Sequence, residues 1–297
     1  MTTVAVVGTG RMGTAMARSL ARGGTDLILY NRTPEKCAVL ADQLHARVVD
    51  TPAAAAAASD IAISMLADGP AVEEVWTGPE GLLEGASAGS VLVDMSTVPP
   101  DVIRGFEAAA RDRGAGILDA PVSGSVPLAE TGKLTIMVGG SADDLERARP
   151  AFEQLATRVV HIGPLGSGAS LKLAVNVLIF GLNQALAEAL VLAERSGVDR
   201  ALAYDFFVTS AAGAPFVGYK RDHFVSPDTT PVGFSLGLTR KDLGLILGLA
   251  ESLQVPMPQT RGNLDLVEDT IAALGPDRDT ALVAEQLRAM AGEGVAR

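Results

Sequence analysis

The stretch Thr3-Val4-Ala5-Val6-Val7-Gly8-Thr9-Gly10-Arg11-Met12-Gly13 decides the fold of the N-terminal half of the chain. A short apolar run rich in β-branched residues leads directly into three glycines with the spacing G-x-G-x-x-G. Gly8 permits a tight turn, Gly10 lets the backbone approach a pyrophosphate, and Gly13 lets helix and strand pack closely. The N-terminus of the following helix offers unpaired N–H groups and a positive dipole end to phosphates. The stretch therefore predicts a strand–turn–helix unit that binds a dinucleotide.

Outward from this stretch, short apolar runs alternate with amphipathic stretches of helical spacing. The predicted strands are Thr3–Val7, Asp26–Tyr30, Ile61–Met65, Val91–Asp94, Gly116–Leu118, Leu134–Val138 and Arg158–Ile162. The predicted helices between them include Met12–Arg22, Pro34–Leu44 and Pro52–Ala58. Strands that are continuously apolar and alternate with helices are typical of a parallel sheet covered on both faces. We therefore expect an α/β fold with a Rossmann-type, doubly wound parallel sheet.

The pattern changes at a glycine-rich turn that begins at Gly163. A long apolar helix follows and runs to about Arg195, and only helical patterns come after it: Val198–Phe207, Leu238–Leu253, Gly262–Ala273 and Thr280–Met290. The sequence predicts a Rossmann domain over residues 1–163 and an all-helical domain over residues 164–297, joined by the long helix. Because that helix is apolar on most sides, a small domain can hardly bury it alone, which predicts a homodimer or a dimer of dimers.

Composition excludes several classes of partner. The 297 residues include 24 Lys and Arg and 35 Asp and Glu, a formal charge of −11, which disfavours nucleic acid and anionic membranes. The long helix carries Lys172, Asn176, Asn183, Gln184 and Glu188, so we expect it not to cross a bilayer. A single cysteine, Cys37, and no apolar leader indicate a reducing, cytoplasmic compartment. Three scattered histidines predict no metal site.

The end of the second predicted strand indicates which nicotinamide cofactor is used. An acidic residue there would bind a ribose 2′-hydroxyl and repel a 2′-phosphate. This chain has Asn31-Arg32-Thr33, which offers a guanidinium, an amide and a hydroxyl to a phosphate. The sequence therefore predicts NADP(H). Arg32 could also be an ordinary surface residue.

Four further patches carry polar groups where a ligand could bind. Ser64-Met65-Leu66-Ala67 and Asp94-Met95-Ser96-Thr97 end two strands, although serine and threonine also commonly turn a chain after a strand. Asp119-Ala120-Pro121-Val122-Ser123-Gly124-Ser125 ends in a turn that can present hydroxyl and N–H groups to an anion, or simply be a β-turn. Lys172 and Asn176 share one helix face, where the lysine could act in chemistry or snorkel to solvent.

Taken together, these motifs resemble those of the β-hydroxyacid dehydrogenase family, which includes 3-hydroxyisobutyrate dehydrogenases and glyoxylate/succinic semialdehyde reductases. The elements that carry the resemblance are Gly8–Gly13, Asp119–Ser125, Gly163–Asn176 and Lys241-Asp242, in the family's order and spacing. The resemblance covers essentially the whole chain. It implies an oxidoreductase that transfers hydride to or from a small carboxylate-bearing substrate.

The resemblance also implies a role for individual residues. Lys172 matches the catalytic lysine that protonates the substrate oxygen, and Asn176 the residue that helps to hold it. Ser123, Gly124, Thr97 and Lys241 match substrate contacts. The implied cofactor contacts are Gly8, Gly10, Arg11, Met12, Gly13, Asn31, Arg32, Thr33, Met65, Leu66, Ala67, Thr97 and Lys241. Within the family, Asn31-Arg32-Thr33 is similar to the NADPH-dependent reductases of small aldehyde-acids.

Two other interpretations remain open at this point. Imine reductases share the architecture and the NADPH preference, but Lys172 and the Asp119–Ser125 turn disfavour that chemistry. A non-catalytic NADP-binding protein would have no need of Lys172 and Asn176. Ser210–Phe216 is expected to line the substrate pocket, and Lys220, Arg221 and Lys241 are nearby cations of unassigned role.

Overall fold

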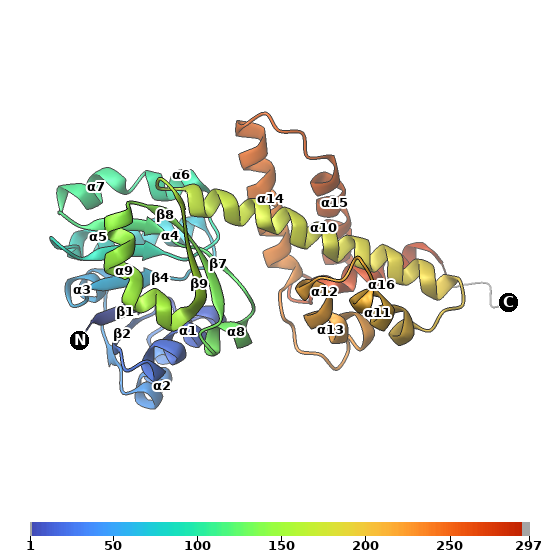
Figure 1. The fold of residues 1–297 in the computed structure, drawn as a ribbon, viewed down its shortest axis with the longest axis horizontal. Coiled ribbons are helices and arrows are strands. Elements are labelled where there is room, and N and C mark those ends of the chain that lie inside the picture. Colours follow the sequence, from blue (N-terminus) through green and yellow to red (C-terminus); the bar gives the residue numbers. More distant parts are fainter. Residues whose placement is uncertain (1, 293–297) are drawn as a thin grey trace. The chain divides into compact units, whose positions relative to one another are not determined.

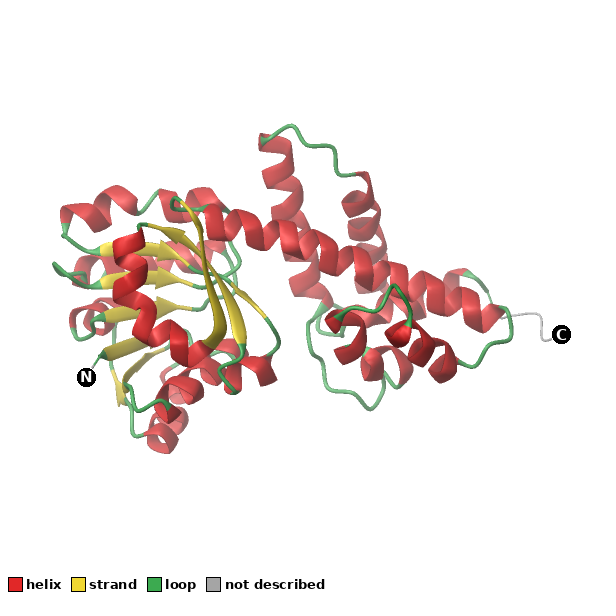
Figure 2. Cartoon of the chain, in the orientation of Figure 1, coloured by secondary structure: helices red, strands yellow, loops and turns green. Residues whose placement is uncertain are grey.

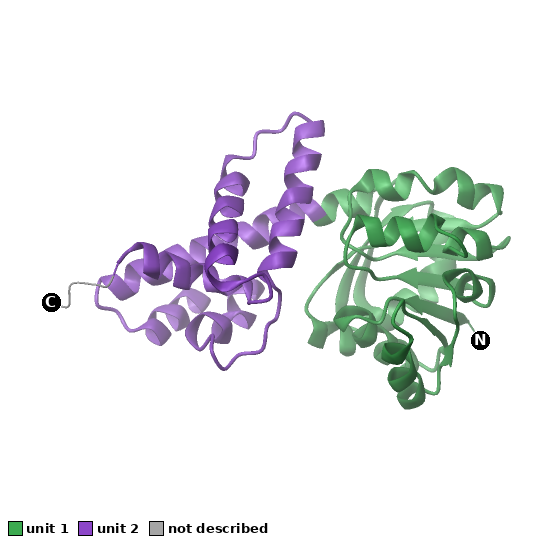
Figure 3. Cartoon of the chain, turned by 180° about the vertical axis from the view of Figure 1, so that it is seen from behind, with its two compact units in different colours: residues 1–172 green, residues 173–297 purple. Residues whose placement is uncertain are grey.

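The computed structural model describes residues 2–292, which form two compact units divided between Lys172 and Leu173 (Figure 3). The division lies inside the long helix α10 (Ser167–Arg195), whereas the sequence-based boundary of 163/164 lies at the end of the last strand. The first turns of α10 are part of the N-terminal unit because they pack against its sheet. The final residues of the second predicted domain, 293–297, lie outside the described residues.

The N-terminal unit is built on one mixed sheet (Figures 1 and 2). Its strands are β1 (Thr3–Val7), β2 (Asp26–Tyr30), β3 (Arg47–Val48), β4 (Ile61–Ser64), β5 (Val91–Asp94), β6 (Gly116–Asp119), β7 (Val122–Ser123), β8 (Leu134–Gly140) and β9 (Ala156–Gly163). Their order is β3-β2-β1-β4-β5-β6-β8-β7, with β9 paired to β8. The predicted α/β Rossmann class is confirmed.

One part of the sheet differs from the parallel arrangement that the sequence predicts. β1 to β6 are parallel, but β8 pairs antiparallel with both β6 and β7. A parallel neighbour needs a crossover of a dozen residues or more, and the segment between β7 and β8 is too short for one. The short strands β3 and β7 are also absent from the prediction, because two residues carry no periodic signal.

Alternate residues of the central strands point to opposite faces, and each face has its own hydrophobic core. Val4 and Val6 belong to one core, while Ala5 and Val7 belong to the other. The helices that cover these faces are α1 (Arg11–Arg22), α2 (Pro34–Leu44), α3 (Pro52–Ala57), α4 (Gly69–Thr77), α5 (Leu82–Gly85), α6 (Pro100–Arg104), α7 (Glu107–Asp112), α8 (Val126–Glu130) and α9 (Ala142–Leu155). This burial on both faces explains why the strands are continuously apolar.

The strand order changes direction beside β1. The chain moves outward from β1 to β2 and β3, and then returns to place β4 on the other side of β1. In open α/β sheets, ligands bind outside the carboxyl ends of the strands at such a switch point. Because β1, β2, β4 and β5 are parallel, the loops that follow them all lie along this edge.

The C-terminal unit is all-helical, as the sequence predicts. It contains most of α10, together with α11 (Arg200–Thr209), α12 (Pro215–Tyr219), α13 (Arg221–Val225), α14 (Leu236–Ser252), α15 (Pro258–Leu274), the 3₁₀ turn η1 (Thr280–Leu282) and α16 (Val283–Met290). α10 is long and apolar enough to cross a bilayer by length and composition alone. It also carries part of the core of this unit, and its buried Asn183 donates to the carbonyl of Thr280.

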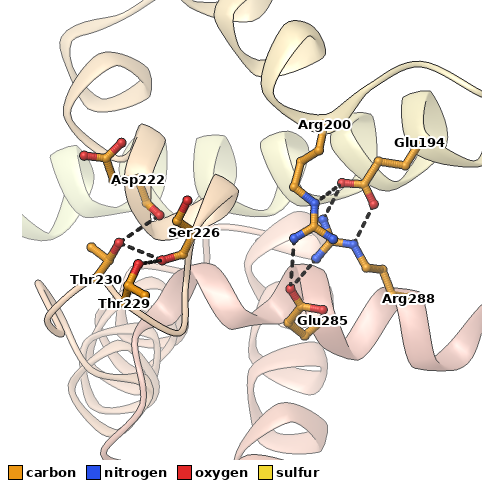
Figure 4. A network of polar contacts seen from close by, with 8 residues as sticks. All are labelled: Glu194, Arg200, Asp222, Ser226, Thr229, Thr230, Glu285 and Arg288. Atoms are coloured by element: carbon orange, nitrogen blue, oxygen red, sulfur yellow. Dashed lines mark hydrogen bonds and ion pairs between the residues drawn. The ribbon is translucent and has the colours of Figure 1, made fainter.

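Ion pairs join the helices of this unit. Glu194, near the end of α10, accepts hydrogen bonds from Arg200 of α11 and Arg288 of α16, and both arginines also pair with Glu285 (Figure 4). The two arginines hold the pKa of Glu194 below its usual value, although burial opposes them. The cluster therefore fastens three helices at one end of the unit.

Candidate active site

The glycine-rich turn after β1 has the geometry that its sequence predicts. Gly8 has φ +101°, which favours glycine, and its N–H donates to the carbonyl of Tyr30 at 2.8 Å. A Cβ on Gly8 would lie 2.5 Å from the carbonyl oxygen of Met65. A Cβ on Gly13 would lie 1.9 Å from the carbonyl oxygen of Gly8. Both positions therefore require glycine for the protein's own packing.

Gly10 differs from these two glycines, because the protein leaves space around it. It is the N-cap of α1, has an ordinary φ of −70°, and no neighbouring atom lies within 4 Å of where its Cβ would be. The first turn of α1, which Arg11 and Met12 begin, contains no acidic side chain. An uncapped helix N-terminus beside open space fits the pyrophosphate of a dinucleotide.

The end of β2 is tied to this turn by Asn31. Its Oδ1 accepts from the N–H of Thr9 at 3.1 Å, and its Nδ2 donates to the carbonyl of Thr33 at 3.0 Å. Asn31 therefore shapes the loop. Arg32 is 80% exposed, and its Nη1 lies 3.6 Å from Oε2 of the exposed Glu74 on α4. Thr33 begins α2 without a hydrogen bond from its side chain to that helix.

A buried network joins the loops that follow β4 and β5. Oδ1 of Asp94 accepts from the hydroxyls of Ser64 at 2.7 Å and Ser96 at 2.8 Å. The indole of Trp76 donates to Ser64 Oγ, and the N–H of Leu66 donates to Ser96 Oγ at 2.9 Å. Burial raises the pKa of Asp94 to about 6, and the serine hydroxyls oppose that rise.

This network holds the loops that follow β4 and β5 in place, at the carboxyl ends of the strands where the cofactor is expected to bind. It fixes the backbone of Leu66 within the predicted cofactor loop Met65–Ala67, and it fixes the turn that precedes the half-buried Thr97. Asp94 itself is buried beneath these loops. It is a supporting residue that sequence reasoning did not assign.

The predicted substrate turn includes and follows β7, which is the outermost strand on one side of the sheet. Ser123 is half-buried in β7 and pairs with Thr135 of β8, while Gly124 is exposed with φ +139°. A Cβ on Gly124 would lie 2.8 Å from the side chain of Leu134, so both conformation and packing require glycine there. The turn therefore presents backbone and a serine hydroxyl with little side-chain bulk.

The start of α10 is anchored to the carboxyl end of β6. The buried carboxylate of Asp119 accepts from the N–H of Gly166 at 2.7 Å and from the N–H of Ala169 at 2.6 Å. Lys172 lies one helical turn beyond Ala169 and is half-buried. The candidate general acid is therefore on a helix that begins at the same edge of the sheet as the cofactor loops.

In the helical unit, a buried carboxylate joins two other predicted site residues. Asn176 of α10 is buried, and its Nδ2 donates to Oδ2 of Asp242 at 2.9 Å. Lys241 Nζ lies 2.8 Å from the other oxygen of Asp242, on α14. Lys241 and Asp242 are recognisable in the sequence as a pair, but nothing in their spacing indicates that Asp242 also orients Asn176.

Two of the cations near the expected specificity segment are engaged elsewhere. Lys220 is buried, and its Nζ lies 2.7 Å from Asp279 Oδ1. Arg221 forms an ion pair with Asp205. Within Ser210–Phe216, Phe216 belongs to the hydrophobic core of the helical unit rather than to an open surface. These contacts give Lys220, Arg221 and Phe216 structural roles.

Cys37 lies beneath the glycine-rich turn. Its thiol is buried in α2, and Sγ lies 3.7 Å from the hydroxyl of Thr9. Burial raises the pKa of the thiol, and the hydrogen bond with Thr9 opposes that rise. Cys37 is therefore a packing residue.

The two halves of the chain match two family sequence models. Residues 3–163 match the NAD-binding domain of 6-phosphogluconate dehydrogenase. Residues 166–287 match the NAD-binding domain of NADP-dependent 3-hydroxyisobutyrate dehydrogenase.

Known proteins align along nearly the whole chain. The 2-hydroxy-3-oxopropionate reductase of Escherichia coli is 34% identical over 98% of both chains. The solved 3-hydroxyisobutyrate dehydrogenase of Mycobacterium tuberculosis is 31% identical, with a TM-score of 0.85 over 97% of this chain and 99% of that one. An imine reductase from Pseudomonas sp. shares the fold at 21% identity and a TM-score of 0.65, over 96% of this chain and 99% of that one. The chain therefore belongs to the β-hydroxyacid dehydrogenase family, whose members are nicotinamide-dependent oxidoreductases of small hydroxy acids.

Proposed function

We propose that this enzyme uses NADPH to reduce a small aldehyde- or keto-acid to the hydroxy acid, or catalyses the reverse reaction, with Lys172 as the general acid. The observation that carries the proposal is that the glycine-rich turn and the start of the Lys172 helix both lie at the carboxyl edge of one sheet. Gly10 leaves room for a phosphate at this edge, and Asp119 anchors the helix there.

The chemistry assigns separate tasks to the two kinds of residue. Bound NADPH would supply the hydride. As a carbonyl is reduced, negative charge develops on its oxygen, and the Lys172 ammonium stabilises that charge and donates the proton. Asn176, oriented by Asp242, holds the substrate beside the lysine. Ser123 and Gly124 bind the substrate carboxylate, and Thr97 and Lys241 complete the substrate and cofactor contacts.

A preference for NADPH is supported by the residues at the end of β2. Arg32 is the exposed cation there, with Asn31 and Thr33 shaping the loop beside it. The ion pair between Arg32 and Glu74 is exposed on both sides and is therefore weak, so a 2′-phosphate can displace it. Met65, Leu66 and Ala67 would contact the cofactor from the neighbouring strand end, and Arg11 and Met12 from the first turn of α1.

The substrate class is supported by the names of the relatives. These include a glyoxylate/succinic semialdehyde reductase of Arabidopsis thaliana, 32% identical, and a 3-sulfolactaldehyde reductase of Escherichia coli, 32% identical. Each of these names describes a reductase of an aldehyde that carries an anionic group. Glyoxylate is itself an aldehyde-acid. We propose the same class here, in a cytoplasmic enzyme whose single thiol is buried.

A homodimer is supported by apolar side chains that the helical unit leaves exposed. Leu178 and Leu192 on α10 are 68% and 70% exposed, and Phe206 on α11 is 70% exposed. Leu178, Ala185 and Leu192, spaced seven residues apart, form one exposed stripe along the part of α10 that belongs to this unit. Replacing Leu178 with glutamate is expected to yield monomers in sedimentation analysis, and an unchanged oligomer would contradict this interface.

The test of the reaction is steady-state oxidation of NADPH, with NADH as the comparator. The substrates would be glyoxylate, succinic semialdehyde, 2-hydroxy-3-oxopropionate and a cyclic imine. We expect turnover of an aldehyde-acid with a preference for NADPH, and Arg32→Ala should weaken that preference. Lys172→Met should lower kcat by about 10²–10⁴-fold while NADPH still binds.

The other outcomes separate the alternatives. Turnover of the imine alone would identify an imine reductase, and tight NADPH binding with no turnover would favour a non-catalytic role. Normal turnover by Lys172→Met would remove the lysine from the mechanism while leaving the reaction itself intact.

A further inference from the structure

Asp119 ends β6, and the proposed reaction gives its carboxylate no task. Its side chain is buried, so it does not reach a ligand directly. Instead, each of its two oxygens accepts a short hydrogen bond from a backbone N–H at the start of α10, from Gly166 and from Ala169. The first turn of a helix leaves such N–H groups without intrahelical partners.

The segment that Asp119 holds packs closely against the sheet. A Cβ on Gly168 would lie 2.4 Å from the carbonyl oxygen of Met137 and 2.8 Å from that of Asp119. A Cβ on Gly139, in β8, would lie 2.2 Å from the Asp119 carboxylate. The start of the helix therefore sits directly on the backbone of β6 and β8.

Arg104, on α6, makes a second contact with the same turn. Arg104 Nε donates to the carbonyl of Leu165 at 3.1 Å. Its guanidinium also lowers the pKa of Asp119, together with the two bound N–H groups, although burial raises that pKa more. An ionised carboxylate at a helix N-terminus is stabilised by the helix dipole, and its hydrogen bonds are stronger than those of a neutral acceptor.

We propose that Asp119 is a positioning residue that fixes the start of α10 and thereby sets where Lys172 lies at the cofactor edge. This rests on the proposed role of Lys172 as general acid. Lys172 is three residues beyond Ala169, so a tilt or slide of the first turn moves the lysine with it. A displacement of about 1 Å at a reacting group can lower the rate about 100-fold.

Asp119→Asn is the direct test, because asparagine keeps the volume but turns one acceptor into a donor that faces a backbone N–H. We expect kcat to fall about 10–100-fold with the NADPH dissociation constant changed by less than about twofold. In a Lys172→Met background the same change should have no further effect, because the lysine it positions is absent. An equal loss in that background would overturn the proposal.

A matched control uses an ordinary helix cap. Asp199 accepts from the N–H of Leu202 at the start of α11, in the helical unit. Asp199→Asn also removes a carboxylate from a helix N-terminus, and we expect it to leave kcat unchanged.

A second readout does not depend on turnover. Lys172 would be acetylated with acetic anhydride and its initial rate measured by mass spectrometry relative to exposed Lys133. We expect Asp119→Asn to change the relative rate for Lys172 by about threefold or more, and Asp199→Asn to leave it unchanged. This shift together with normal turnover by Lys172→Met would remove the acid role but retain the positioning role, and no shift would overturn the positioning role.

Arg104→Met provides the same test if Asp119→Asn fails to fold. Arg104 is partly exposed, and its replacement by methionine would loosen the same turn by removing one hydrogen bond. A several-fold loss of kcat that disappears in the Lys172→Met background supports the proposal, and an unchanged kcat contradicts it.

Discussion

Asp94 should make the N-terminal unit more stable as the pH falls from 7 to 5. Its pKa is about 6 in the folded protein, against 3.8 for the ordinary carboxyl, because burial disfavours the ionised form. The folded state therefore binds the proton more tightly than the unfolded state. Asp94 therefore contributes most to the unfolding free energy at pH values below its ordinary pKa, and this contribution is lost as the pH rises through 6.

The size of the effect follows from the same two values. Keeping the carboxylate ionised in the core costs about 3 kcal/mol relative to its protonated form. Between pH 7 and pH 5 the folded protein gains about 1 kcal/mol of this, because Asp94 becomes largely protonated while the unfolded chain stays largely ionised. Asp94→Asn removes the titration but leaves an oxygen that can accept from Ser64 and Ser96.

Urea unfolding followed by the fluorescence of Trp76 measures this effect. Trp76 is the only tryptophan of the chain, and its indole donates to the same Ser64 hydroxyl that donates to Asp94. The unfolding free energy of the wild type minus that of Asp94→Asn should rise by about 1 kcal/mol from pH 7 to pH 5. The exposed carboxylate Asp42 gives the control variant Asp42→Asn. A difference that stays constant or falls over this range would refute the reasoning.

Three further predictions test other parts of the structure. Gly10→Ala should leave the melting temperature unchanged but weaken NADPH binding about tenfold or more by calorimetry, because only a ligand needs the space beside Gly10. Gly13→Ala should lower both the melting temperature and the affinity for NADPH. Equal effects of Gly10→Ala and Gly13→Ala on the melting temperature would contradict this reasoning. Lys220→Met should destabilise the helical unit by about 3–5 kcal/mol in urea unfolding followed by circular dichroism, because the buried carboxylate of Asp279 loses its lysine partner. A loss under about 1 kcal/mol would argue against a structural ion pair. Glu74→Gln should tighten NADPH binding a few-fold at low salt and leave NADH unaffected, and tighter binding of both would show another cause.

The fold could be predicted where the signal is local. Thr3–Val7, Asp26–Tyr30 and Val91–Asp94 begin and end where the sequence predicts, because each is a continuous apolar run flanked by turn residues. The antiparallel direction of β8 could not be predicted in this way, since the apolar pattern of a buried strand is the same for both directions.

In the candidate site, too, only the residues whose signal is local could be predicted from the sequence. The glycine-rich turn is recognisable because its three glycines act within six residues of chain. The supporting carboxylates are not, because their partners are distant in sequence: Ser64 and Asp94 are 30 residues apart, and Asp119 and Gly166 are 47 apart. Nor could spacing reveal that Lys220 is buried against a residue 59 positions away.

The double contact of Asn31 limits how the cofactor preference of this enzyme could be redesigned. An acidic residue at the end of β2 is the obvious way to favour NAD, and position 31 is one place to introduce it. An aspartate there would still accept from Thr9 but would set a carboxylate against the carbonyl of Thr33, which would break the contact that ties the glycine-rich turn, which both cofactors need, to the start of α2. Redesign should therefore begin at Arg32 and Glu74, whose side chains reach solvent and leave the turn intact.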